Sequence, residues 1–224
     1  MSEKRVFLPV AAAYDRWSAF YDTYENPMVF AAGTVVAMRA ANWADKDVFE
    51  FGCGTGRNLS VMKSAGARSV AGSDFSEGML SVARARDASF ALLRRDMSLP
   101  LPLAEASVDV VLFCLTLEHV ADLVVPLKEA GRIVRPGGEI AVLEIHPYMS
   151  HSGVSAHFKD GAEEVSMPAY PHQFSSYINA VSEAGLRLQG CREWCPKDFG
   201  EMAPLKALKR GPDFPLVVEF SLSR

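Results

Sequence analysis

A single stretch decides the fold of this 224-residue chain: Val48-Phe49-Glu50-Phe51-Gly52-Cys53-Gly54-Thr55-Gly56. Residues 48–51 are predicted to form a short strand, which three alternating glycines close, and residues 57–65 are predicted to form a helix. Glycine has no Cβ, so such a turn lets the backbone press against a ligand, which the first helical amides can bind. Taken alone, the turn could also be only a tight connection. Its Gly-x-Gly-x-Gly spacing differs from the dinucleotide-binding pattern and disfavours an NAD(P)-dependent redox enzyme.

Strands and helices alternate on the C-terminal side of this stretch. Further strands are predicted at residues 69–72, 90–93, 108–113 and 139–145, with helices from residues 76 and 122 and a hard turn at residues 136–138. This alternation is typical of a parallel sheet with right-handed crossovers. Residues 186–194 and 216–222 are predicted to form an antiparallel hairpin at one edge of the sheet, after an irregular stretch at 146–171 and a helix at 173–184. We therefore predict an α/β fold with a mostly parallel seven-stranded sheet and helices on both faces.

Composition and charge exclude several classes of protein. Hydrophobic residues make up 49% of the chain and charged residues 22%, which is typical of one globular domain over residues 1–224. The 23 basic and 27 acidic residues give a net charge of −4, which argues against binding nucleic acid, and no apolar run is long enough for a membrane span. The apolar run at residues 6–13 is too short for a signal peptide, and the four cysteines form no Cys-x-x-Cys, so we expect a cytoplasmic protein with reduced thiols.

Acidic residues follow the second and third predicted strands. Asp74 lies 22 residues after Gly52, where a carboxylate can accept two hydrogen bonds from a ribose diol, and Asp96 follows the next strand. Asp74 could instead cap the helix that begins at Ser76, and Asp96 could face water. Together with the glycine turn, the two acids predict a nucleoside site at the carboxyl ends of the strands.

As a set, the motifs of residues 47–147 resemble class I S-adenosylmethionine-dependent methyltransferases, in the ubiquinone/menaquinone-biosynthesis-like group that methylates small molecules. The resemblance is carried by the glycine stretch and by Gly72-Ser73-Asp74-Phe75-Ser76 with Met79, Arg95-Asp96-Met97, Leu117-Glu118-His119-Val120 and Arg135-Pro136-Gly137-Gly138. It implies a Rossmann-like fold and S-adenosylmethionine as the methyl donor, with S-adenosylhomocysteine as its product.

The resemblance also implies which residues bind the donor. The donor's methionine end would lie against Gly52, Gly54 and Gly56, with Glu50 supporting its ammonium and the backbone near Leu115 beside it. Asp74 would hold the ribose hydroxyls. The adenine would lie near Phe75 and Met79, with Asp96 on its amino group and the Met97 amide on a ring nitrogen. Tyr14 and Tyr21 would belong to N-terminal helices that close over the donor.

The N-terminal segment, residues 1–45, is predicted to form those lid helices. Tyr14, Trp17, Tyr21 and Tyr24 are spaced by three and four residues, which places them on one helical face, and residues 28–42 form a second helix. The aromatic residues could instead pack on the sheet, and both roles are compatible. Residues 46–145 would then be the donor-binding core.

The acceptor side is predicted in two later segments, residues 146–172 and 195–215. Four of the five histidines lie in the first, and His146 or His151 is expected to be the general base, since histidine titrates near neutral pH. Each could also be a cap or packing residue. Glu144 could face the acceptor or pair with a basic residue, and Lys206, Lys209 and Arg210 could attract an acidic acceptor or form a solvated rim. The histidine spacing argues against a metal site.

These observations predict a methyltransferase that moves the donor's methyl group to O or N of a small molecule by in-line displacement. Alternatives are a methyltransferase acting on a protein or nucleic acid, or a donor-binding protein with other chemistry. An Asn-Pro-Pro-Tyr motif after the fourth strand would favour nucleic acid, but that position reads Leu115-Thr116-Leu117-Glu118. We expect a monomer or homodimer.

Overall fold

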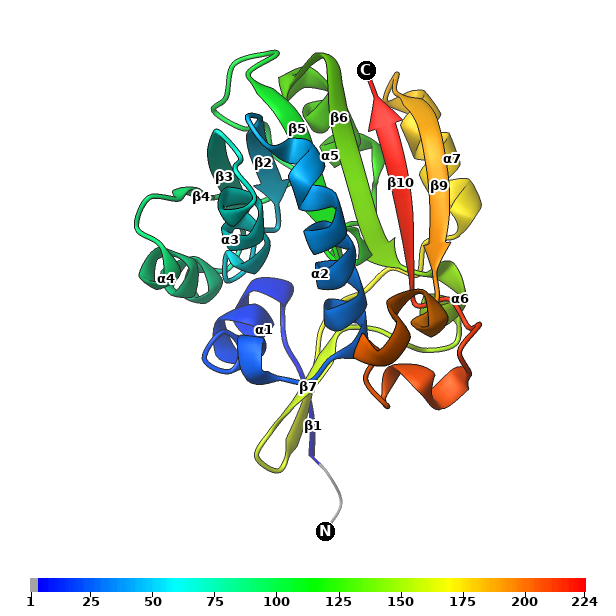
Figure 1. Ribbon diagram of the computed structural model, residues 1–224. Coiled ribbons are helices and arrows are strands. Elements are labelled where there is room, and N and C mark those ends of the chain that lie inside the picture. Colours follow the sequence, from blue (N-terminus) through cyan, green and yellow to red (C-terminus); the bar gives the residue numbers. More distant parts are fainter. Residues whose placement is uncertain (1–3) are drawn as a thin grey trace.

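The computed structural model describes residues 4–224, and its centre is a seven-stranded sheet (Figure 1). In spatial order its strands are β4 (Ala91–Arg94), β3 (Ser69–Asp74), β2 (Asp47–Phe51), β5 (Val108–Cys114), β6 (Val134–Ile145), β10 (Val217–Ser223) and β9 (Arg187–Trp194). The first five are parallel, and β10 runs antiparallel to both β6 and β9. The predicted Rossmann-like α/β fold and its edge hairpin are confirmed.

Helices cover both faces of this sheet. One face packs against α2 (Pro27–Ala40), α3 (Arg57–Ser64) and α4 (Glu77–Arg86), and the other against α5 (Val124–Ile133) and α7 (Phe174–Glu183). Side chains of β5 alternate between the two layers: Leu112 belongs to the first and Phe113 to the second, and both are fully buried. This is why the central strand is apolar at nearly every position.

The N-terminal segment differs from the prediction of lid helices alone. Its first three residues lie outside the described part of the chain. It then begins with strand β1 (Lys4–Phe7), followed by α1 (Val10–Trp17) and a 3₁₀ turn, η1 (Tyr21–Thr23). Since α1 ends at Trp17, the prediction that four aromatic residues share one helix is wrong. The spacing of three and four is real, but the chain turns within it.

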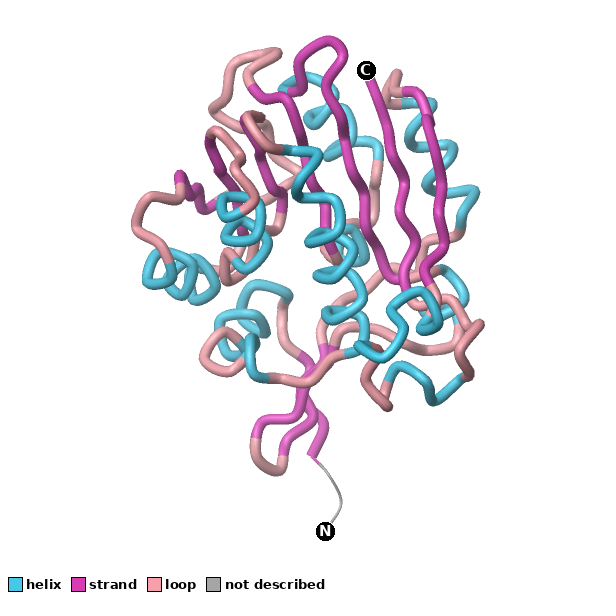
Figure 2. Tube along the Cα trace, in the orientation of Figure 1, coloured by secondary structure: helices cyan, strands magenta, loops and turns pink. Residues whose placement is uncertain are grey.

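The stretch after β6 is more ordered than predicted. It contains α6 (Pro147–His151), β7 (His157–Asp160) and β8 (Glu163–Ser166). β8 pairs in parallel with β1 and antiparallel with β7, and these strands form a small second sheet beside the N-terminus (Figures 1 and 2). Strand pairing over some 160 residues leaves no local pattern in the sequence, so it could not be predicted.

Two other local predictions also change. The hard turn at residues 136–138 lies inside β6, where the pairing with β5 shifts register. Gly138 lies against the backbone of β5 there, since an added Cβ would meet the Asp109 carbonyl oxygen at 2.5 Å. The loop at 195–215 contains two 3₁₀ helices, η4 (Pro196–Met202) and η5 (Ala207–Arg210).

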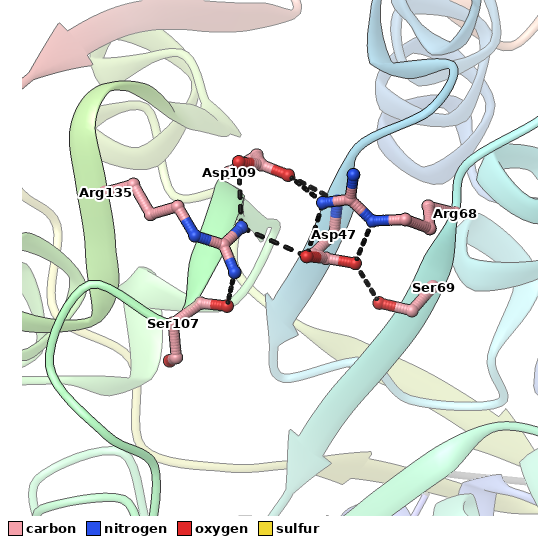
Figure 3. Close-up of polar contacts among 6 residues, drawn as sticks. All are labelled: Asp47, Arg68, Ser69, Ser107, Asp109 and Arg135. Atoms are coloured by element: carbon pink, nitrogen blue, oxygen red, sulfur yellow. Dashed lines mark hydrogen bonds and ion pairs between the residues drawn. The ribbon is translucent and has the colours of Figure 1, made fainter.

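A network of ion pairs joins the amino ends of β2 and β5 (Figure 3). Asp47 and Asp109 lie between Arg68 and Arg135; Arg68 donates to Asp47 at 2.9 Å and to Asp109 at 2.7 Å. The hydrogen bond from Arg68 is the largest effect that lowers the pKa of Asp47. Because the glycine turn lies at the opposite, carboxyl end of β2, this network serves stability.

Candidate active site at the carboxyl ends of the strands

The glycine turn leaves β2 in a conformation that suits glycine. Gly52 has φ +65°, and an added Cβ would lie 2.1 Å from the Thr116 hydroxyl oxygen, so no other residue fits without displacing that side chain. Gly54 has φ +52° and open space where a Cβ would be. The turn therefore presents bare backbone to the space above the strand ends.

Asp74 fastens this turn to the next helix. Its carboxylate accepts hydrogen bonds from the Gly54 amide and from the Ser76 amide, each at 2.8 Å. Ser76 itself caps α4 by accepting from the Met79 amide. Asp74 thus partly has the alternative capping role, because it accepts from the Ser76 amide just before α4. The carboxylate is half-buried, and burial raises its pKa.

A cavity of about 170 Å³ lies over these strand ends, and we call it the strand-end cavity. It brings together all the residues predicted to bind the donor except Glu50 and Gly56: Tyr14, Tyr21, Gly52, Gly54, Asp74, Phe75, Met79, Asp96, Met97 and Leu115. Residues from the N-terminal segment, from α4 and from the carboxyl ends of β2, β3, β4 and β5 thus meet in one place, as the resemblance implied.

Glu50 and Gly56 lie outside that lining. Glu50 is 1% exposed beneath the turn; its Oε1 accepts a 2.7 Å hydrogen bond from Asn58, and its Oε2 has no partner. Burial raises its pKa to about 8. A buried carboxylate oxygen without a donor suits a ligand that brings an ammonium group. Gly56 is different: an added Cβ would touch Phe90 and Ala83, so it allows α3 and α4 to pack and does not face the cavity.

Two of the N-terminal aromatic residues, Tyr14 and Tyr21, line the strand-end cavity, and all four pack among themselves. Trp17 contacts Tyr14, Tyr21 and Tyr24, with ring centroids 4.9–5.7 Å apart. It also stacks on Phe158 of β7 at 4.7 Å. Trp17 therefore packs on the small sheet formed by β1, β7 and β8. Asp15 ties α1 to α4, because its carboxylate accepts from the Ser76 hydroxyl and the Gly78 amide.

A second cavity, of about 340 Å³, adjoins the first, and we call it the insertion cavity. The two cavities share Tyr14, Tyr21 and Leu115 as lining residues. Both predicted acceptor-side segments contribute to the insertion cavity, for example through Met149 and Lys209. The shared wall is where a group could pass from one ligand to another.

The two histidines predicted as the base line neither cavity. His146 is fully buried; its Nδ1 accepts from the Tyr148 amide as the cap of α6, and its Nε2 lies 3.1 Å from Glu193. His151 ends α6 and is exposed. This geometry matches the alternative of a cap for His146, and the catalytic role of either residue stays a prediction.

His119 lies in the wall of the strand-end cavity. Its Nδ1 is 2.8 Å from the Pro168 carbonyl oxygen, which can only accept, so Nδ1 carries the proton and Nε2 accepts from the Tyr14 hydroxyl at 2.9 Å. Burial lowers the pKa of His119, which keeps the ring neutral.

Glu118 is the functional candidate to which the sequence assigned no role. It is 8% exposed, lines the insertion cavity, and burial raises its pKa to about 7. It belongs to the Leu117-Glu118-His119-Val120 motif. That motif indicated the family, but it did not show into which cavity the Glu118 side chain points. Glu144, by contrast, is fully buried and accepts from the Thr116 and Leu117 amides.

Two kinds of feature, a metal-binding cluster and a membrane-spanning helix, are absent from residues 4–224. Within residues 4–224, no group of three or more His, Cys, Asp or Glu side chains is placed to hold a metal ion. None of the helices in this part of the chain combines the length and apolarity needed to cross a membrane.

Known proteins resemble this chain in sequence and fold. It is 31% identical over 131 residues to a malonyl-[acyl-carrier protein] O-methyltransferase of Serratia marcescens, covering 58% of this chain and 50% of that protein. It is 32% identical over 145 residues to a demethylmenaquinone methyltransferase of Staphylococcus aureus, covering 62% and 58%. The chain thus spans about half the length of the curated relatives it matches. An S-adenosylmethionine-dependent methyltransferase structure from Mesorhizobium loti has the same fold, with a TM-score of 0.67 and 23% identity over 84% of this chain and 96% of that one.

The match to a family model covers the strands and turns that build the strand-end cavity. Residues 49–142 match the model of a methyltransferase domain. The range begins in β2, just before the glycine turn, and ends in β6, so it contains Asp74, Asp96 and Glu118. Residues 49–142 of this chain therefore resemble a methyltransferase domain, and the predicted resemblance to S-adenosylmethionine-dependent methyltransferases is confirmed.

Proposed function

We propose that the protein transfers the methyl group of S-adenosylmethionine to an oxygen or nitrogen atom of a small molecule. The observation that carries this proposal is the pair of adjoining cavities with Tyr14, Tyr21 and Leu115 as their shared wall. When bound, S-adenosylmethionine supplies a methyl group already activated by its sulfonium. The protein then needs to align that group with the acceptor atom and keep water out.

The residues of the strand-end cavity suit the parts of this donor. Glu50, with its unpartnered Oε2, would hold the ammonium, and Asp74 would accept from the ribose hydroxyls. Phe75 is 45% exposed and lines the cavity with Met79, which suits an aromatic base. Tyr14 and Tyr21 would cover the donor from the N-terminal side.

The insertion cavity supports a small organic acceptor. Its inner walls include Met28, Ile145 and Met149, all buried, and its outer residues include Lys209 and Arg210, which are exposed. A largely apolar cavity of this size suits a small molecule better than a macromolecule. The name of one curated relative refers to demethylmenaquinone, a small organic molecule, and supports the same class, whereas the name of the other refers to a malonyl group on an acyl-carrier protein.

Methyl transfer from labelled S-adenosylmethionine into a cell extract tests the proposal. We expect label in a small organic product, identified by mass spectrometry, with equimolar S-adenosylhomocysteine. Label in protein or nucleic acid would support the macromolecular alternative instead. Binding of S-adenosylhomocysteine without any transfer would indicate a donor-binding protein with other chemistry.

A further inference from the structure

The turn that follows β5 directs two neighbouring side chains into different cavities. In the 3₁₀ turn η3 (Leu117–His119), His119 lines the strand-end cavity and Glu118 lines the insertion cavity. Leu115, one turn earlier, lines both, in a left-handed conformation with φ +55°. Glu118 therefore enters the insertion cavity close to the wall that the two cavities share.

This turn is held firmly in place. The Leu115 amide donates to the Leu143 carbonyl at 2.8 Å. The next two amides, of Thr116 and Leu117, both donate to Glu144 Oε1, at 3.0 and 2.9 Å. The position of Glu118 is thus set by the backbone rather than by an ion pair, which is what a group that must act on a ligand requires.

Glu118 keeps hydrogen-bonding capacity for a ligand. The Ala156 amide donates to its carboxylate, and burial outweighs this contact, so that its pKa is about 7. Among residues 4–224, the basic side chain nearest to it is His119, whose Nε2 is 4.0 Å away and accepts from Tyr14. The other titratable groups around it are Glu144 and Tyr177, which are buried, and Tyr14 and Tyr21, which are half-buried.

The insertion cavity contains one other carboxylate, Glu25, among the described residues. Glu25 has a side-chain exposure of 79%, and Lys206 holds it at 2.8 Å. His157 also lines the cavity, but it is exposed, and its Nδ1 contacts the Ser155 carbonyl oxygen. Glu118 is thus the buried proton acceptor of this cavity.

We propose that Glu118 is the general base of the reaction, taking the proton from a neutral O–H or N–H group of the acceptor. The acceptor atom forms a bond to the methyl carbon while the methyl–sulfur bond breaks, and that electron pair stays on sulfur. The proton moves from the acceptor atom to a Glu118 oxygen and then to solvent. This proposal rests on the proposed function.

The same geometry narrows the class of acceptor. A phenol, an alcohol or an amine carries a proton that must leave, and Glu118 can receive it. A carboxylate acceptor has no such proton at neutral pH, and the charged form of Glu118 would repel it. A base role for Glu118 thus predicts a protic neutral acceptor, with an ether or a methylated amine as the product rather than a methyl ester, although Lys206, Lys209 and Arg210 also line this cavity.

The test compares Glu118→Gln and Glu118→Asp with the wild type in the labelled-methyl assay on cell extract, from pH 5.5 to 9. Glu105→Gln is the control, since it changes an exposed carboxylate, paired with Arg224, that lines neither cavity. We expect Glu118→Gln to lose roughly 10²–10⁴-fold in rate. We expect its affinity for S-adenosylhomocysteine to be unchanged and the rise in rate around pH 7 to disappear. Glu118→Asp should keep part of the rate, and Glu105→Gln all of it.

Several results would overturn the assignment. They are a wild-type rate in Glu118→Gln, a pH profile that keeps its rise, an equal loss in Glu105→Gln, or a methyl ester as the wild-type product. A loss of S-adenosylhomocysteine affinity that matches the loss of rate would make Glu118 a structural residue. If the wild type binds S-adenosylhomocysteine but transfers no methyl group, the proposed function fails first, and the role of Glu118 with it.

Discussion

Glu50 should release a proton when the donor binds. Its buried carboxyl has a pKa of about 8, so at pH 7 about nine in ten molecules carry the proton. An ammonium placed against the unpartnered Oε2 favours the charged carboxylate and lowers that pKa. Binding should therefore release about 0.9 protons at pH 7 and about 0.5 at pH 8.

Titration calorimetry with S-adenosylhomocysteine, in two buffers of equal pH and different ionisation enthalpy, measures this number directly. Glu50→Gln should abolish the release and weaken binding by about 10–150-fold, because a hydrogen bond to a charged group is worth about 1.5–3 kcal/mol. The ligand 5′-methylthioadenosine lacks the amino-acid end and should release no proton from the wild type.

The matched control is Glu144→Gln, since Glu144 is equally buried and its pKa is also about 8, but it holds the turn after β5. That variant should still release the proton. If Glu50→Gln and the wild type show the same dependence on buffer, the ammonium does not bind at Glu50, and this account of the donor's methionine end is wrong.

Three further outcomes are expected. Asp74→Asn should weaken S-adenosylhomocysteine binding by about 10-fold or more in calorimetry, since an amide cannot accept from both the donor and two backbone N–H groups; equal affinity in Asp74→Asn and in the wild type would refute its role. Hydrogen exchange of α1 should slow when S-adenosylhomocysteine binds, and equal exchange would leave its aromatic residues as packing only. The pKa of Asp47 lies below its unfolded value, so its ion pairs contribute stability above about pH 4 that is lost as pH falls. Since Arg68 is 56% exposed, we expect that contribution to stay under about 1 kcal/mol, and urea unfolding of Asp47→Asn should show a flatter dependence on pH between 5 and 2.

Most of the fold was predictable from local patterns. The central strands are buried on both faces, so they are apolar at nearly every position, and the helices between them carry one apolar face. The glycine turn was also predictable, from its three alternating glycines. The structure gives the reason for Gly52, which has a positive φ and lies against Thr116. The acids that follow β3 and β4 could be placed at one edge of the sheet, since the carboxyl ends of parallel strands meet there.

Other features of the site depend on contacts between distant segments. The pairing of β1 with β8 follows from no local spacing, and it sets Trp17 against Phe158. His146 and Glu118 are both polar residues that follow strands, and nothing in their neighbours shows which of them faces a cavity. The His146 amide donates to the Leu216 carbonyl and its ring contacts Glu193 of β9, whereas η3 directs Glu118 inward.

The sequence by itself thus determined the strands of the donor-binding core and the residues that follow their carboxyl ends, because backbone geometry and burial pattern are local properties. Only the tertiary structure decided which titratable side chain enters the insertion cavity. That choice depends on desolvation and on the direction of a side chain, and both are set by residues that are far away in the chain.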